Sequence, residues 1–117
     1  MKLAGEEITI IRPDDWHVHL RDESIMSAVI VDTALNFRRA VVMPNLSPPI
    51  LTVEDALSYK ARLLDAINFL VKNNKEIAGQ TNNLDTLKDF QPLMTIYLTE
   101  KISFQELQRV AETQDII

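Results

Sequence analysis

The stretch DWHVHLR, residues 15–21, decides how this chain can fold. Successive residues of a β-strand point to opposite faces of the sheet, so His17, His19 and Arg21 share one face of a strand formed here, together with Asp15. The other face carries Trp16, Val18 and Leu20, which are expected to be buried in the core. The two imidazoles lie about 7 Å apart along the strand, close enough to chelate one metal ion. An arginine beside a cationic metal requires an anion between them, so the pattern predicts a metal site that receives a negatively charged ligand.

Apolar periodicity outside this stretch predicts strands alternating with helices. The predicted strands cover residues 7–11, 15–20, 39–43 and 92–98, and a further strand begins at 115–117. A helix is expected over 23–37, another after the N-cap Thr52, and a third after a capping box formed by Ser103 and Glu106. Alternation of this kind favours βα units and a parallel sheet.

Residues 68–90 interrupt this rhythm. The stretch is rich in asparagine after Val71 and is too polar for a core, so we expect an extended loop with a short helical turn near 84–88. A loop of this length is unusual inside a compact domain.

Composition limits the class of protein. The chain has 117 residues, of which 46% are hydrophobic and 25% charged, as expected for one globular domain. It contains no cysteine, so a metal must be held by His, Asp or Glu, which points to zinc, manganese or a similar ion. The net charge of −5 argues against nucleic acid as the main partner. There is no signal-peptide pattern and no apolar run near the roughly 20 residues that span a bilayer, so a cytoplasmic protein without membrane contact is expected.

Three segments in order resemble the N-terminal part of a dihydroorotase, of the shorter bacterial type in the amidohydrolase superfamily. They are RPDDWHVHLR at residues 12–21, AVVMPNL at 40–46 with Pro48-Pro49, and PLMTIYLT at 92–99. The resemblance implies an α/β fold in which residues 1–117 form about three βα units of a TIM (β/α)8 barrel. Residues 68–90 would be an insertion relative to the family.

The resemblance also implies a reaction and a site. The family uses two zinc ions to interconvert N-carbamoyl-aspartate and dihydroorotate, a small anionic substrate, in pyrimidine biosynthesis, and its members are commonly homodimers. His17 and His19 would bind zinc, and Arg21 and Asn45 would bind the substrate carboxylate.

The family's bridging lysine, further histidine ligands and general-base aspartate cannot be assigned in this chain. We therefore assign no catalytic residue and expect the chain alone to be incomplete and inactive, and to self-associate through uncovered strand edges and apolar faces such as Val41 and Val42. Two alternatives remain open. The chain could be a non-catalytic binding or assembly partner of a full-length enzyme, or a degenerate remnant.

Individual residues also have plainer interpretations. Asp15 is at least as well explained by a structural hydrogen bond at the start of the strand. Asn45 follows a proline, where asparagine commonly serves as a turn residue. Arg21 could be a surface arginine paired with Asp22 or Glu23.

Overall fold

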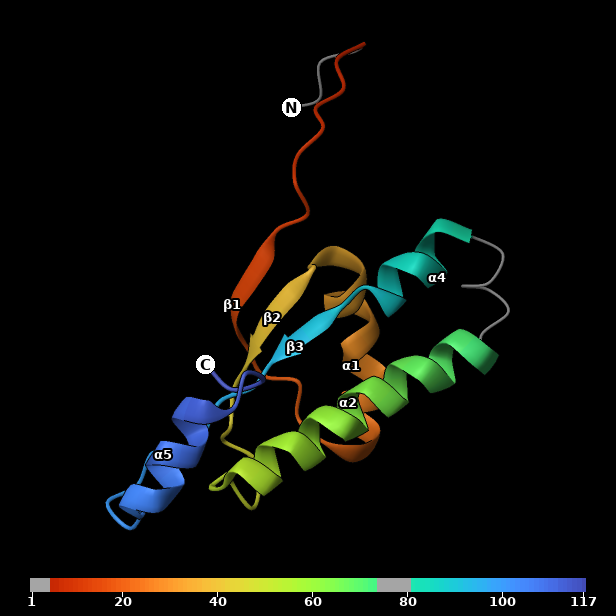
Figure 1. The fold of residues 1–117 in the computed structure, drawn as a ribbon. Helices are drawn as coiled ribbons and strands as arrows, with labels where there is room; N and C mark the ends of the chain where they lie inside the picture. Colours follow the sequence, from red (N-terminus) through yellow and green to blue (C-terminus); the bar gives the residue numbers. More distant parts are fainter. Residues whose placement is uncertain (1–4, 74–80) are drawn as a thin grey trace.

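Residues 5–73 and 81–117 are described by a computed structural model, whose centre is a three-stranded parallel sheet (Figure 1). The sheet order is β1-β2-β3, with β1 at Asp14–Val18, β2 at Arg39–Val42 and β3 at Gln91–Leu93. The helices are α1 (Glu23–Asn36), α2 (Val53–Asn73), α4 (Thr81–Lys88) and α5 (Phe104–Glu112). The predicted alternation of helices with parallel strands is confirmed.

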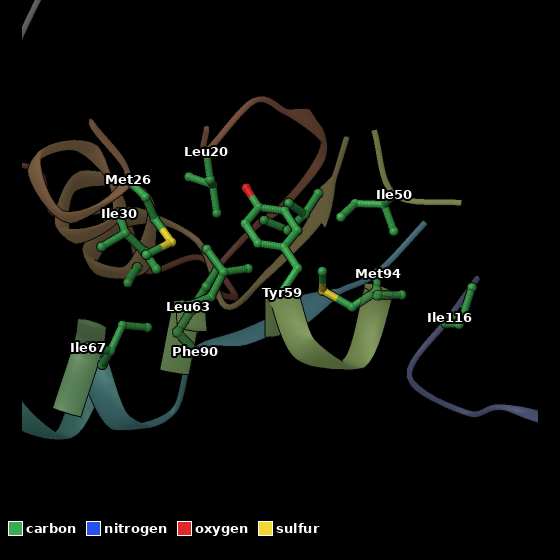
Figure 2. Packing of buried hydrophobic residues seen from close by; sticks show 14 of the residues in the cluster. Leu20, Met26, Ile30, Ile50, Tyr59, Leu63, Ile67, Phe90, Met94 and Ile116 are labelled. Atoms are coloured by element: carbon green, nitrogen blue, oxygen red, sulfur yellow. The ribbon is translucent and has the colours of Figure 1, made fainter. Parts of the chain in front are cut away.

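The core lies between the sheet and the helices α1, α2 and α4 (Figure 2). α2 contributes Tyr59, Leu63 and Ile67 to this core. Each is at most 2% exposed, and the three residues recur at helical spacing. Full burial of one large apolar side chain contributes roughly 1.5–3 kcal/mol. The helices therefore cover the sheet with apolar side chains. Val41 and Val42, which we expected to be uncovered, are 7% and 1% exposed.

β1 is less regular than its sequence predicts. Its pairing with β2 shifts by one position between Asp15 and Val18, as a β-bulge does, and the His17 N–H donates to the Asp15 side chain instead of to a neighbouring strand. Trp16 lies within this irregularity and is 68% exposed. The prediction that Trp16 lies in the core is therefore wrong, because a bulge redirects the side chains that simple alternation would bury.

The predicted strand at residues 7–11 is also wrong. This segment is extended, has no sheet partner among residues 5–73 and 81–117, and projects away from the body of the molecule (Figure 1). Ile8 and Ile11 are 85% and 89% exposed. β-branched residues favour extended backbone, but a strand also needs a partner to receive its hydrogen bonds.

The expected loop at 68–90 is helical at both ends. α2 continues through Asn73, because Leu70 and Val71 extend its packed face, and α4 places a fully buried Leu87 against the core. Residues 74–80 lie outside the described part of the chain. Whether this region is an insertion relative to the family stays a prediction.

The third strand is shorter than predicted. β3 ends at Leu93, and Met94 then forms an isolated parallel bridge with Ile116. Lys60 of α2 holds the same C-terminal segment by an ion pair of 2.5 Å with Asp115. The fourth parallel strand predicted to begin at 115–117 is thus present in the structure only as this single parallel bridge.

Both predicted helix caps form. The Thr52 hydroxyl accepts the Asp55 N–H at 3.1 Å, and the Asp55 carboxylate accepts the Thr52 N–H at 3.2 Å. At α5, the Ser103 hydroxyl accepts the Glu106 N–H at 3.1 Å. None of the helices within residues 5–73 and 81–117 is long and apolar enough to cross a membrane.

Glu106 does not complete the expected capping box at Ser103. Its carboxylate accepts the N–H of Val53, the first residue of α2, at 2.7 Å. On the same side of α5, Arg109 pairs with both Glu54 and Glu106. α5 buries no residue fully, and Phe104 is 79% exposed. Val110 packs partly buried against the core, and the polar contacts of Glu106 and Arg109 join α5 to the start of α2.

Replacing Glu106 by Ala should therefore destabilise the fold by about 1–2 kcal/mol, because an N–H at the start of α2 loses its charged acceptor. Urea denaturation of the two chains measures the difference. Glu112→Ala is the matched control, because Glu112 is exposed on the same helix and meets only Gln108, at 3.5 Å. Equal losses in the two variants would contradict a capping role for Glu106.

Candidate metal centre

Two imidazoles meet where β1 ends. The Nε2 atoms of His17 and His19 are 3.1 Å apart, with the ring planes at 63° to each other. Two nitrogens bound to one tetrahedral zinc at 2.0–2.1 Å lie about 3.3 Å apart. The observed separation fits two ligands of a single ion, and both side chains are exposed to an incoming ligand. That these two histidines bind one metal ion stays a prediction.

Asn45 joins the histidines from the neighbouring strand. β2 ends at Val42, and the next residues lead Asn45 to a position where its Oδ1 lies 2.9 Å from His19 Nδ1. A backbone turn also forms here, since the N–H of Leu46 donates to the Pro44 carbonyl at 3.0 Å. Asn45 thus lies in a turn, as its plainer interpretation held, while its side chain contacts an imidazole.

An open pocket of about 390 Å³ surrounds this group at the carboxyl ends of the strands. We call it the strand-end pocket; its lining residues are His17, His19, Met43, Pro44, Asn45, Ile96, Tyr97 and Leu98. Within residues 5–73 and 81–117, no group of three or more His, Cys, Asp or Glu side chains could hold a metal ion. The pocket therefore supplies two imidazole ligands and an apolar wall, and two neutral imidazoles alone bind metal weakly.

Asp15 has the structural role that sequence reasoning allowed. Its Oδ1 accepts the backbone N–H of His17 at 3.0 Å. The carboxylate thereby fixes the backbone that carries the first imidazole. Asp15 acts on the candidate metal centre through His17.

The position of Arg21 differs from the one that strand alternation predicts. β1 ends at Val18, and Arg21 has a φ of 59°, in the left-handed region that only a few residues other than glycine adopt. The predicted shared face therefore stops before Arg21, which is absent from the lining of the strand-end pocket. Its partner by the plainer interpretation, Asp22, instead pairs with Arg62. The role of Arg21 in substrate binding stays a prediction.

A cluster that sequence reasoning missed holds this loop against α2. The Tyr59 hydroxyl donates to the Arg21 carbonyl, and Figure 2 shows that hydroxyl directed toward the segment that carries Leu20. Arg62 lies over the Tyr59 ring, 5.3 Å from its centroid, and donates twice to Asp22, at 3.0 and 2.8 Å. The apolar periodicity of α2 identified Tyr59 only as a core residue. The sequence signal for its hydrogen bond was a hydroxyl at a fully buried helix position, because a buried hydroxyl needs an acceptor.

The same cluster shifts two pKa values. Hydrogen bonds from Arg62 lower the pKa of the Asp22 carboxyl, which also caps α1 by accepting the Glu23 N–H. Burial raises the pKa of Tyr59 to about 12, because the phenolate would lose its hydration. Tyr59 is thus a neutral hydrogen-bond donor to the loop at pH values well below 12.

Known proteins resemble this chain over most of its length. A dihydroorotase of Nitrosomonas europaea is 44% identical over 109 residues, which cover 93% of this chain and 27% of the relative. One from a Marinomonas species is 50% identical over 102 residues, covering 87% and 25%. No protein-family model matches the chain. The chain spans about a quarter of the length of the curated relatives that it matches.

Solved structures of dihydroorotases resemble this chain as well. The crystal structure of a dihydroorotase from Campylobacter jejuni superposes with a TM-score of 0.65 at 30% identity, covering 86% of this chain and 25% of that one. A dihydroorotase from Saccharomyces cerevisiae, solved in complex with 5-fluoroorotic acid, has a TM-score of 0.55 at 23% identity and supports the fold alone. In sequence and in fold, the chain matches the N-terminal part of dihydroorotases, so the resemblance found in the sequence is confirmed.

The shifted tyrosine predicts a pH dependence. The pKa of Tyr59 is about 12 in the folded chain and about 10 in the unfolded chain. Protonated Tyr59 therefore favours the folded state fully below pH 10, and this contribution to the free energy of unfolding falls as the pH rises toward 12. Tyr59→Phe should be less stable than the parent by about 1 kcal/mol at pH 8, through loss of the hydrogen bond to Arg21. That advantage of the parent should shrink above pH 10, by up to about 1.4 kcal/mol per pH unit.

Urea denaturation of both chains between pH 8 and 11 measures the difference. Tyr97→Phe, at an exposed position, controls for the loss of a tyrosine as such. A difference between parent and Tyr59→Phe that stays constant across this range would contradict the proposed burial of the phenol.

Proposed function

We propose that this chain supplies the first strands of the active site of a zinc-dependent dihydroorotase, which interconverts N-carbamoyl-aspartate and dihydroorotate in cytoplasmic pyrimidine biosynthesis. One observation carries the proposal: the Nε2 atoms of His17 and His19 converge to 3.1 Å beside Asn45. They do so at the carboxyl ends of parallel strands, where TIM-barrel enzymes carry their active sites. The match to dihydroorotases supports the choice of reaction.

Each site residue has a distinct role in this proposal. His17 and His19 hold zinc through Nε2, and a bound zinc ion polarises the amide carbonyl of the substrate as a Lewis acid. Arg21 is exposed and positively charged, which suits a substrate carboxylate. Asn45 offers its amide N–H groups to the same carboxylate while its oxygen faces His19.

The described residues make only one wall of such a site. Two imidazoles do not complete a catalytic zinc site, which usually has at least three protein ligands. A whole barrel needs about 250 residues. We therefore propose that the remaining metal ligands and the general base belong to barrel units outside the quarter of a dihydroorotase that this chain matches. We also propose that these 117 residues alone do not turn over substrate.

A chimera tests the function. In the Nitrosomonas europaea dihydroorotase, the segment that matches this chain is replaced by the chain itself, and hydrolysis of dihydroorotate is measured with zinc present. We expect an active chimera, and His17→Ala within it should lower kcat/KM by more than about 100-fold, because a metal ligand is lost.

Ser47→Ala in the same chimera is the control, because Ser47 is exposed near the pocket but does not line it. The proposal fails if the chimera folds and hydrolyses dihydroorotate but His17→Ala and His19→Ala leave its rate and zinc content unchanged. The isolated chain with zinc should show no turnover above its own His17→Ala variant.

An assembly role is the second candidate, and exposed apolar residues favour it. Ile8, Ile10 and Ile11 are 72–89% exposed, and Trp16 on the edge strand β1 is 68% exposed. An apolar segment next to an unpaired strand edge is prone to pair with another chain. We propose that the isolated chain self-associates through this edge, as family homodimers also suggest.

Sedimentation velocity over a range of concentrations tests this association. The parent chain should form dimers or larger species, and Ile10→Lys should shift it toward monomer, because a charge on the edge opposes pairing. Phe104→Lys, at a similarly exposed apolar position on α5, is the control. A monomeric parent chain at all concentrations would exclude self-association.

A further inference from the structure

The contact between Asn45 and His19 specifies where the imidazole proton lies. An amide oxygen can only accept a hydrogen bond, and Asn45 Oδ1 is 2.9 Å from His19 Nδ1. His19 Nδ1 must therefore carry the proton and donate it. In a neutral imidazole the other nitrogen is then unprotonated, so the Nε2 lone pair of His19 faces the Nε2 of His17, 3.1 Å away.

Backbone hydrogen bonds on both sides of Asn45 hold it next to the strand that carries His17. The Met43 N–H donates to the Val18 carbonyl at 2.9 Å, and the Ile50 N–H closes the loop onto the Pro44 carbonyl at 2.9 Å. His19 and Asn45 both lie just past the ends of their strands. We take the amide as the group that orients the imidazole, because an amide oxygen can only accept a hydrogen bond, whereas either nitrogen of a neutral imidazole can carry the proton.

We propose that Asn45 is a positioning residue for His19, whose amide oxygen selects the Nδ1–H tautomer and so leaves Nε2 free to bind metal beside His17. The identity of the metal as zinc rests on the proposed function; the tautomer does not. The same side chain then has two uses, because its NH2 group remains free of His19 and can donate to an anionic substrate. In this proposal the Asn45 amide contacts a metal ligand through its oxygen and the substrate carboxylate through its nitrogen.

Histidine NMR of the metal-free 117-residue chain tests the tautomer directly. Two-bond ¹H–¹⁵N correlations recorded at pH 8 distinguish the protonated from the unprotonated nitrogen of each imidazole ring. The parent chain should show the Nδ1–H form at His19. Asn45→Asp keeps an oxygen acceptor and should retain this form, whereas Asn45→Ala should give a mixture of both tautomers.

Titration with Co²⁺, followed by its absorption, tests the consequence for metal binding. Asn45→Ala should weaken Co²⁺ binding by about 10–100-fold, as loss of a group that orients a metal ligand typically does, and Asn45→Asp should restore it. Ser47→Ala, in the same loop, should match the parent in both measurements. Circular dichroism checks that each variant is folded.

The proposal is overturned if His19 in the parent chain carries its proton on Nε2, or if Asn45→Ala leaves the tautomer unchanged. The outcome for the proposed function is separate. If the parent chain and His17→Ala bind Co²⁺ equally poorly, His17 and His19 do not form a metal site in the isolated chain, while the tautomer result still decides the role of Asn45. If His17→Ala abolishes binding but Asn45→Ala has no effect on binding or tautomer, the metal site stands and the positioning role is wrong.

Discussion

Burial of the short strand β2 is the constraint on which the rest of the structure depends. Ala40, Val41 and Val42 are consecutive, so they point alternately to both faces of the sheet, and all three are buried. Because its side chains are buried on both faces, β2 contacts its neighbouring strands through backbone hydrogen bonds. Both neighbours, β1 and β3, run parallel to it. Parallel pairing brings the ends of all three strands to one edge. The strand-end pocket exists because β2 sets that edge.

The edge explains why side chains far apart in the sequence form one group. His19 and Asn45 are separated by 26 positions, yet each follows the last residues of its own strand, and the strands are paired in register near Val18 and Val42. The third strand brings Ile96 and Tyr97 to the same place. The candidate metal centre is thus a product of strand register, and its chemistry is carried by the few residues just past the strand ends.

Much of this fold and part of the site could be predicted from the sequence, because the strongest signals are local and periodic. The helix at 23–36, the buried strand at 39–42 and the caps at Thr52 and Ser103 follow from apolar spacing and from side-chain oxygens near helix starts. The convergence of His17 and His19 follows from their spacing.

What could not be predicted depends on partners or on single backbone angles. Residues 7–11 have the composition of a strand, but pairing needs a neighbour that composition does not reveal. Trp16 is exposed because β1 is irregular, and Arg21 leaves the expected face because of one left-handed φ. The cluster of Tyr59 with Asp22 and Arg62 crosses about 40 positions and leaves no periodic trace in the sequence.

The way α5 is attached has a consequence for how the molecule opens. α5 has no fully buried residue, and charged contacts from Glu106 and Arg109 connect it to the first turn of α2. Charged contacts at exposed positions weaken with salt, whereas the apolar packing of α2 against the sheet does not. α5 is therefore expected to be a separate unit of local unfolding, with its amides exchanging before those of β2. Ionic strength would then set how often the start of α2 loses its cap, without disturbing the core that holds the strand ends together.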